Sequence, residues 1–157
     1  MILVDNTVLS NFARTNHLSL LRSFCNNEGL TPQAVQDEFQ VGIDQGLFLE
    51  TGLSWLKLVE MTNPQEIQLS QLYQRDLGKG ESECLAIAIC RKYALLTDDH
   101  KARLFGFREK VRISGSIGVL VSLVTKSAIS LPDGNQVLRE FIDAGYFSPF
   151  SALDGLF

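Results

Sequence analysis

Two short apolar runs, each followed directly by aspartate, limit the folds open to this chain more than any other feature. The first run is Ile2 to Val4 and leads into Asp5, and the second is Ala94 to Thr97 and leads into Asp98 and Asp99. Continuous apolar runs of this length are typical of strands buried on both faces, as the strands of parallel sheets are. The runs therefore predict an α/β fold in which helices cover both faces of a central, mostly parallel sheet, giving three α/β/α layers.

The segments around these runs continue the alternation of strand and helix. Besides 2–4 and 94–97, strands are predicted at 29–31, 55–61 and 110–114. Helices are predicted at 8–13, 17–24, 32–44, 64–77, 81–93, 99–107, 117–126 and 134–145. A hydroxyl side chain precedes two of these helices, so Thr7 and Thr31 are the expected N-caps, with Pro32 at the first helical position.

Length and composition exclude several classes of protein. With 157 residues, of which 45% are apolar, the chain is long enough for one domain with a sizeable core. A net charge of −4 argues against a protein that coats nucleic acid by bulk charge. The three cysteines lack the paired spacings of a zinc site and indicate buried thiols in a reducing compartment. No basic leader opens the chain, and its longest apolar stretch, Ile117 to Val124, is far below the roughly 20 residues of a bilayer span, so we expect a cytoplasmic protein without a membrane partner.

Acidic residues are predicted to gather at one edge of the sheet, beyond the carboxyl ends of the strands, where open parallel sheets bind their ligands. They follow the two buried strands or lie on helices that can reach the same edge: Asp5, Asp98 and Asp99, and Glu38, Glu81 and Glu83. Each has a purely structural interpretation: Asp5 and Asp99 as helix caps, Glu38 as a solvated charge, Glu81 as a first-turn acid. Together they repel, because two carboxylates about 4 Å apart cost roughly 4 kcal/mol at an effective dielectric near 20. A cation must therefore lie among them, or their pKa values must rise.

An acidic cluster without histidine or cysteine selects hard cations. The expected cofactor is Mg²⁺ or Mn²⁺, as one or two ions, and such sites suit phosphate chemistry. Two ions about 3.5–4 Å apart could activate water and stabilise the leaving oxygen in phosphodiester hydrolysis. Neither histidine is an expected ligand, and His17 and His100 are assigned to the surface.

Four segments, in this order and at these intervals, resemble the acidic motifs of the PIN-domain nucleases: LVDNTVLSNF, TPQAVQDEF, GKGESECLAIAIC and LLTDDHKAR. The likeness extends from Met1 to about Leu123 and is closest to the small prokaryotic VapC-like proteins. By position it supplies the four acids and the hydroxyl that follows the first of them: Asp5, Glu38, Glu81, Asp99 and Thr7. The chain departs from the family pattern at Asn6, where a small or hydroxyl residue is more usual, and at Glu81, where aspartate is the usual acid.

The resemblance implies a metal-dependent ribonuclease, often the toxin of a toxin–antitoxin pair and usually dimeric. The chain, 1–157, is then a single PIN-like domain with its motifs in 1–123 and a helical extension in 124–157. The four acids would hold one or two Mg²⁺ or Mn²⁺ ions, and four residues are expected to support them: Thr7, Asp98, Glu83 and Asn6. The implied partners are an RNA substrate, an antitoxin protein and a second copy of the chain.

The adjacent aspartates cannot serve one ion from equivalent positions, because successive side chains leaving a strand point to opposite sides. Family-like spacing favours Asp99, the acid two residues beyond Thr97, which itself follows Glu81 by sixteen residues. Asp98 is then left to accept from backbone amides at the start of the helix 99–107, or to support the site indirectly.

Basic residues flank the third and fourth motifs. They are Arg75 and Lys79 before the third, and Lys101, Arg103, Arg108, Lys110 and Arg112 after the fourth. Two interpretations stay open: a weak site for the RNA backbone, for which Arg75, Lys79, Lys101 and Arg103 are the candidates, and an ordinary solvated face. If RNA binds, we expect single-stranded or loop RNA, because a recessed acidic site needs a strand that can bend into it.

Two other functions are open on the sequence. A phosphotransfer protein of the receiver or haloacid-phosphatase kind also places aspartates at strand ends. However, VDNTVLS lacks a second aspartate two residues after the first, and the adjacent aspartates lie late in the chain. A PIN-like module that binds RNA or protein without turnover would keep the fold, although the chain retains all four acids.

The C-terminal segment 131–157 carries five phenylalanine or tyrosine rings, more than an exposed tail is expected to show. These rings either pack on the chain's own core or form a surface for a homodimer or an antitoxin segment.

Overall fold

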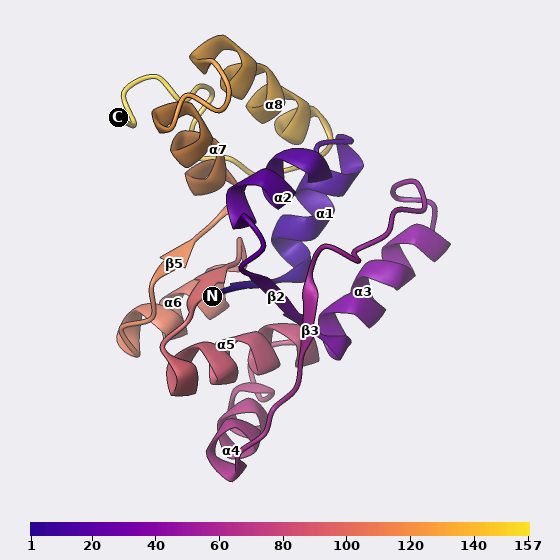
Figure 1. The fold of residues 1–157 in the computed structure, drawn as a ribbon, viewed down its shortest axis with the longest axis vertical. Coiled ribbons are helices and arrows are strands. Elements are labelled where there is room, and N and C mark those ends of the chain that lie inside the picture. The colour runs from indigo at the N-terminus through magenta and orange to yellow at the C-terminus, as the bar shows by residue number, and fades with distance from the viewer.

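A five-stranded sheet forms the middle layer of the computed structural model, which describes residues 1–157 (Figure 1). Its strands are β1 (Ile2–Val4), β2 (Gly29–Pro32), β3 (Lys57–Val59), β4 (Ala94–Leu96) and β5 (Ile113–Ser114). They lie in the order β3-β2-β1-β4-β5, and every neighbouring pair is parallel. The sheet is thus entirely parallel, with β1 at its centre and β4 beside it.

Eight helices flank the sheet: α1 (Asn6–Arg14), α2 (Leu18–Cys25), α3 (Gln33–Asp44), α4 (Pro64–Tyr73), α5 (Lys79–Arg91), α6 (His100–Arg108), α7 (Ser116–Thr125) and α8 (Leu131–Asp143). In Figure 1, α1, α2, α7 and α8 lie above the sheet, while α4, α5 and α6 lie below it. Helix α3 lies at the side and contacts both α1 and α5. The predicted three-layer α/β/α fold is confirmed. None of these helices combines the length and the apolar character that crossing a membrane requires.

Burial explains why the sequence located the inner strands better than the outer ones. Strands β1, β2 and β4 are buried at nearly every position, whereas β3 and β5 pair on one side only and are partly exposed. The predicted edge strands 55–61 and 110–114 are shorter in the structure, at Lys57–Val59 and Ile113–Ser114. The apolar pattern at a sheet edge therefore extends beyond the residues that actually pair.

The structure corrects both predicted helix caps. The N-cap of α1 is Asp5, whose carboxylate accepts from the Thr7 backbone N–H, so Thr7 lies inside the first turn. Thr31 belongs to β2, and its hydroxyl donates to the Val4 carbonyl oxygen of β1 at 3.2 Å. Helix α3 then begins after Pro32, which occupies the N-cap position without a side-chain hydrogen bond. The preference of threonine for helix N-caps predicts both positions as caps, because the sequence does not reveal the hydrogen bonds that each hydroxyl makes with a distant part of the chain.

Two further helices have different bounds from those predicted. Helix α4 ends at Tyr73 instead of residue 77. Helix α8 begins at Leu131, three residues early, because the Ser130 side chain caps it by accepting from the Asp133 N–H and Pro132 occupies its first turn.

The hydrophobic core extends from the sheet to the last helix. Leu3 and Leu95 of the central strands belong to the same buried cluster as Val137 and Leu138 of α8 and Leu153 beyond it. The C-terminal segment therefore packs against the rest of the chain.

The five aromatic rings of that segment are divided between core and surface. Phe141 meets Phe12 of α1 edge-on, with ring centroids 4.9 Å apart, and Tyr146 meets Phe141 at 6.0 Å. Three rings remain exposed: Phe147, Phe150 and Phe157. Packing on the chain's own core thus accounts for two rings of the five.

Candidate active site

The candidate site lies where the two central strands end side by side. Val4 and Leu96 are partners in the parallel ladder, and the Asp5 N–H donates to the Leu96 carbonyl oxygen at 3.0 Å. The next residues along each strand, Asp5 and Thr97, are both buried. Each is followed by a helix, because the chain must leave the sheet at this edge to cross over to the next parallel strand.

Asp5 is the most deeply buried acid of the site, with 1% of its surface exposed. Its Oδ2 atom accepts hydrogen bonds from the Thr7 hydroxyl at 2.7 Å and the Thr97 hydroxyl at 2.9 Å. Its Oδ1 atom has no hydrogen-bond partner, the only buried side-chain nitrogen or oxygen of the chain in that condition. Burial raises the pKa of Asp5, and the two hydroxyls oppose that rise. A buried oxygen without a partner needs an explanation, and a cation ligand is one that fits its chemistry.

Two threonine hydroxyls connect the ends of β1 and β4. Each donates to Asp5, and each also accepts from a backbone amide that follows β4. The Asp98 N–H donates to the Thr7 hydroxyl at 3.0 Å, and the Asp99 N–H donates to the Thr97 hydroxyl at 3.2 Å. Because the donor and an acceptor position of each hydroxyl are occupied, the orientation of Asp5 is fixed from both strands.

Glu81 lies in the first turn of α5, where its Oε2 atom accepts from the Gly78 N–H at 2.7 Å. This is the carboxylate half of a capping box. The pKa of Glu81 is raised to about 7, first by burial and then by the charge of Asp5. This carboxyl therefore changes its charge near neutral pH.

Glu38 reaches the same region from α3 across a close contact between helices. Its Oε1 atom accepts from the Gly80 N–H of α5 at 3.1 Å. A Cβ atom at Gly80 would lie 2.8 Å from that oxygen and 2.9 Å from Val35 Cγ2, so only glycine permits this approach of α3 to α5. Burial raises the pKa of Glu38, and the charge of Asp5 raises it further.

The four acids lie near one another, but they do not form a compact metal cluster. The charges of Asp5, Asp99 and Glu38 all raise the pKa of Glu81. Even so, no three acid, histidine or cysteine side chains of the chain converge closely enough to hold a metal ion between them. Glu38, Glu81 and Asp99 each accept a hydrogen bond from a backbone amide near a helix start, and Asp5 accepts one from the Thr7 N–H.

The donor atoms nevertheless match the requirements of a hard divalent cation. All of them are carboxylate oxygens, which Mg²⁺ and Mn²⁺ prefer. Asp5 offers its unpartnered Oδ1 atom, and each of the other three acids has one carboxylate oxygen without a hydrogen bond from the protein. The residues present therefore fit such an ion.

The two adjacent aspartates after β4 have different roles. Asp99 is the N-cap of α6, and its Oδ1 atom accepts from the Ala102 N–H at 2.7 Å. The capping position expected for Asp98 is thus occupied by Asp99.

Asp98 instead joins β4 to three distant segments. Its carboxylate accepts from the Asn11 side-chain amide at 2.9 Å, from both the N–H and the hydroxyl of Ser116, and from the Tyr146 hydroxyl at 3.4 Å. The helix whose first amide it binds is α7, not α6. Both carboxylate oxygens of Asp98 accept two hydrogen bonds each. These bonds hold the loop that carries Asp99 in place.

The remaining candidates lie around the acids without joining them. The Asn6 side chain accepts from the Ser10 hydroxyl at 3.2 Å within α1. Glu83 lies half-buried on α5, and burial raises its pKa. The His17 ring bonds the Glu140 carboxylate at 2.6 Å, and the exposed His100 begins α6. All three cysteines are free thiols, of which two are buried.

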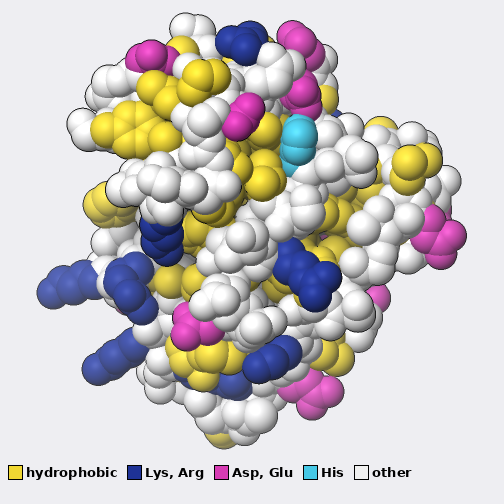
Figure 2. All heavy atoms as spheres, turned by 45° about the horizontal axis from the view of Figure 1, so that its top comes forward, with side chains coloured by type: hydrophobic (Ala, Val, Ile, Leu, Met, Phe, Trp, Pro, Cys, Tyr) yellow, Lys and Arg dark blue, Asp and Glu magenta, His cyan; other side chains and the backbone are white.

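The basic candidates differ in how firmly they are held. Arg75, Lys79 and Lys101 are exposed. Arg103 is half-buried, and its guanidinium donates to the Thr97 carbonyl oxygen at 3.0 Å, beside the acidic site. Figure 2 shows several Lys and Arg side chains on the side of the molecule where α6 and β5 lie in Figure 1.

Several residues that shape the site carry no strong signal in the sequence. In the sequence, Thr97 is used only to count the residues between Glu81 and Asp99. In the structure, its hydroxyl donates a hydrogen bond to Asp5. The partners of Asp98 are separated from it by 87, 18 and 48 residues, so no local pattern connects them. Gly80 lies 42 residues from its partner. Its sequence signal, a glycine on each side of a lysine before a helix, is typical of any helix start.

Comparison with known proteins adds one finding. A family model described as a PIN domain matches residues 1–154. No curated protein and no solved structure matches the chain.

Proposed function

We infer the function of this chain from its family. The chain belongs to the PIN-domain family, whose members are generally nucleases. We propose that it is an endoribonuclease that depends on Mg²⁺ or Mn²⁺ and hydrolyses phosphodiester bonds of RNA. One observation carries the proposal: the Oδ1 atom of buried Asp5 has no partner, and the charges of Asp5, Asp99 and Glu38 all act on nearby Glu81. A divalent cation would supply that missing partner.

In this proposal Asp5, Glu38, Glu81 and Asp99 hold one or two ions. A bound ion of this kind lowers the pKa of water and neutralises charge on the phosphate. Thr7 and Thr97 hold the Oδ2 atom of Asp5, which leaves Oδ1 free for the ion. Without metal, the Glu81 carboxyl, with its pKa raised to about 7, is partly protonated near neutral pH, and cation binding must release that proton. Asp98 positions the loop that carries Asp99.

The test is the Asp5→Asn variant, with Asp143→Asn as a control because Asp143 is an exposed acid on α8. We expect Asp5→Asn to lower the rate of RNA cleavage in Mg²⁺ or Mn²⁺ by more than about a hundred-fold, since a lost ligand costs at least as much as a lost supporting residue. Asn can still cap α1, so the fold is retained. Asp143→Asn should cleave like wild type.

Thermal unfolding supplies a second readout that does not depend on activity. Millimolar Mn²⁺ should raise the melting temperature of the wild-type protein, because the ion binds the folded state, and should raise that of Asp5→Asn far less. If Mn²⁺ raised the melting temperature of both proteins equally and both cleaved RNA at the same rate, Asp5 would not be a ligand of the ion.

A second candidate is a PIN-like module that binds RNA or protein without turnover. The observation in its favour is that three of the acids bond to backbone amides, so that no three ligands converge. Wild-type protein that binds single-stranded RNA but leaves it intact in both Mg²⁺ and Mn²⁺ would support this module over the nuclease. The phosphotransfer alternative has no support from the family match.

Within the family we further propose the VapC-like toxin branch, a homodimer and an antitoxin partner. The ordered motifs support the branch, and the exposed ring of Phe157 offers apolar surface to a protein partner. A gene for a small antitoxin-like protein beside this one would support the pair. Light scattering that reports a strict monomer at micromolar concentration would remove the homodimer.

A further inference from the structure

Two hollows share a wall beside the candidate active site. The first, of about 490 Å³, includes Thr7 and Asp99 among its lining residues. The second, of about 440 Å³, lies between α6, β5, the start of α7 and the segment after α8. Four residues line both hollows: Asp98, His100, Tyr146 and Phe147. The second hollow therefore continues the surface that begins at Asp99, one of the four site acids.

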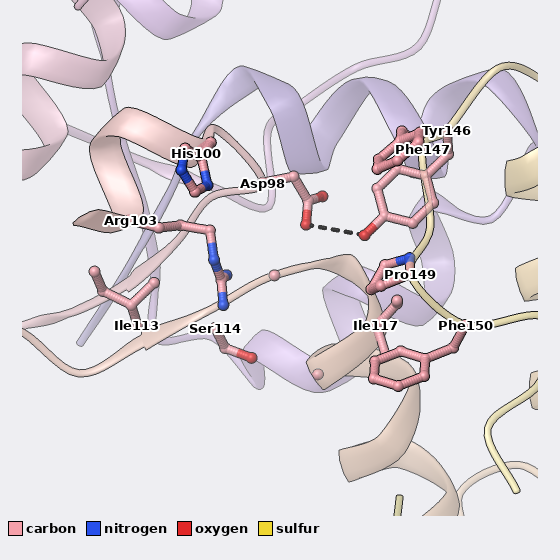
Figure 3. A pocket seen from close by; sticks show the side chains of 12 residues that line it. Asp98, His100, Arg103, Ile113, Ser114, Ile117, Tyr146, Phe147, Pro149 and Phe150 are labelled. Atoms are coloured by element: carbon pink, nitrogen blue, oxygen red, sulfur yellow. Dashed lines mark hydrogen bonds between the residues drawn. The ribbon is translucent and has the colours of Figure 1, made fainter. Parts of the chain in front are cut away.

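We name the second hollow the aromatic pocket. Tyr146, Phe147, Pro149 and Phe150 line one side of it, and His100 and Arg103 line the other (Figure 3). Its volume lies within the roughly 300–1,000 Å³ of sites that bind small molecules. A planar ring system of one or two rings is therefore a suitable occupant.

Arg103 brings a fixed positive charge into the aromatic pocket. Its guanidinium forms no ion pair, because the chain's three ion pairs involve other residues. One N–H donates to the Thr97 carbonyl oxygen, and the other N–H groups have no partner in the chain. A Cβ atom at Gly115 would clash with Oδ1 of Asp98 and lie 3.0 Å from Nη1 of Arg103, so the absent side chain makes room for both groups. The cation lies near the Asp98 carboxylate but is not bonded to it, because Asp98 accepts from Asn11, Ser116 and Tyr146, so the remaining N–H groups of Arg103 are available to a phosphate.

Phe147 presents an aromatic face to the solvent at the junction of the two hollows. Its side chain is 92% exposed, far more than is usual for a ring of this size. Exposed aromatic rings beside an arginine are a common arrangement in proteins that bind single-stranded nucleic acid, where bases stack on the ring and phosphates meet the cation. An apolar protein segment would leave the remaining N–H groups of the Arg103 guanidinium without partners, which is unfavourable.

We propose that the aromatic pocket receives one unpaired base of a single-stranded RNA whose backbone crosses the acidic site. Phe147 stacks on that base, Phe150 lines the pocket beside it, and Arg103 donates to the adjacent phosphate. This inference rests on the proposed ribonuclease function, which it deepens by naming a nucleotide subsite next to the cleaved bond.

The test compares binding of short fluorescein-labelled single-stranded RNAs by anisotropy, in EDTA so that no metal-dependent cleavage occurs. We expect Phe147→Ala to weaken binding about five-fold to a hundred-fold, the range that stacking of one base supplies. Phe147→Trp should bind like wild type. Phe157→Ala is the matched control, because Phe157 is 61% exposed and lies outside both hollows.

An abasic scan shows whether a base occupies the pocket. We use a series of RNAs that each lack one base. One RNA of the series should bind wild type and Phe147→Ala with equal affinity, because the base that stacks on the ring is the one it lacks. The proposal is overturned if Phe147→Ala binds intact RNA as tightly as wild type does. It is also overturned if Phe147→Ala binds every abasic RNA of the series more weakly than wild type by the same factor. Because Phe147 is exposed, the variant should keep the wild-type melting temperature.

The nuclease and the subsite fail in different ways. If wild type leaves RNA intact in Mg²⁺ and Mn²⁺ but Phe147→Ala still weakens binding at one base, the nuclease is wrong and the subsite stands. If cleavage occurs and Phe147→Ala changes neither affinity nor the position of cleavage, the subsite is wrong and the nuclease stands. Loss of self-association in Phe147→Ala, with RNA affinity unchanged, identifies the pocket as a protein interface and overturns the proposal.

Discussion

At the scale of single residues, the two oxygens of Asp5 summarise the candidate site. Oδ2 is bound by the hydroxyls of Thr7 and Thr97, and Oδ1 is buried without a partner. Burying a carboxylate in this way is unfavourable unless a cation compensates its charge. The pKa values of Asp5, Glu38 and Glu81 are all raised, so these three carboxyls resist ionisation in the metal-free site.

This resistance predicts that metal-free protein loses stability as the pH rises. The pKa of Glu81 is about 7 in the folded chain and 4.5 ordinarily, so between these pH values the folded state binds more protons than the unfolded state. The free energy of unfolding must then fall from about pH 4.5 to pH 7. Asp5 and Glu38 act in the same direction. Urea unfolding in EDTA across this range measures the effect.

The matched variants for this measurement are Glu81→Gln and Glu50→Gln. Glutamine can keep the bond to the Gly78 N–H but cannot ionise, so Glu81→Gln should show a clearly flatter dependence on pH. Glu50 is exposed, and its replacement should leave the curve unchanged. A wild-type stability that increases between these pH values would contradict the prediction.

Neighbours in sequence were easier to predict than partners in space. Asp5 and Thr7 are two residues apart, and their association follows from a recognisable motif. The choice between Asp98 and Asp99 depends on Ser116, whose N–H and hydroxyl both bind Asp98. That partner belongs to a different helix. The sequence could place the two acids at the end of β4 and offer Asp99 as a helix cap, but it could not connect Asp98 to the start of α7.

At the scale of elements, one buried ion pair joins α4 to α5. Glu66 is wholly buried, and Arg91 donates to its two oxygens at 2.6 and 3.0 Å. Arg91 lowers the pKa of Glu66 and also donates to the Glu60 carbonyl oxygen. This pair anchors the helix whose first turn carries Glu81.

Replacing Arg91 with methionine should destabilise the protein by about 3 kcal/mol, because Glu66 would remain buried without a counter-charge. We expect the lower part of the usual range, since the Arg91 side chain is 23% exposed. The double variant Glu66→Leu/Arg91→Met should recover much of the loss, because it removes both charges. Urea unfolding measures the free energy of each variant.

Arg22→Met is the control for this series, since Arg22 is exposed and its side chain forms no hydrogen bond or ion pair. A loss below about 1 kcal/mol for Arg91→Met would place the pair among ordinary surface ion pairs.

A strand or helix could be predicted from the sequence where the residues that determine it lie close together along the chain. Strands β1 and β4 were located closely because both faces of each are covered, which produces a continuous apolar run. The edge strands were predicted too long because one side of each has no partner. Helix α8 was predicted to start late because its cap, Ser130, precedes a proline that resembles a loop residue in the sequence.

At the scale of the whole molecule, the segment after α7 belongs to the same core as the motifs. Phe141 packs against Phe12 of α1, and Val137, Leu138 and Leu153 lie in the cluster that includes the central strands. We therefore propose that residues 1–157 form one domain, in which 124–157 is a required part of the core.

Deleting residues 131–157 should abolish cooperative unfolding. The deletion removes four buried apolar side chains, each of which contributes about 2–5 kcal/mol, against a total stability of about 5–15 kcal/mol for a typical domain. Deletion of Phe157 alone is the control, because that ring is exposed. Circular dichroism during heating measures both. A sharp unfolding transition in the shorter chain would show that 1–130 folds by itself.

The central place of β1 also governs when the ribonuclease proposed here can first act during its own synthesis. Asp5 belongs to the first strand made, but the strand that leads to Asp99 is β4, the fourth made, which must pair directly beside β1. At roughly 5–20 residues per second, a ribosome needs about 5–20 s to travel from one aspartate to the other. Throughout that interval the nascent chain carries an incomplete acidic site, so the growing chain itself cannot cleave the messenger from which it is being translated.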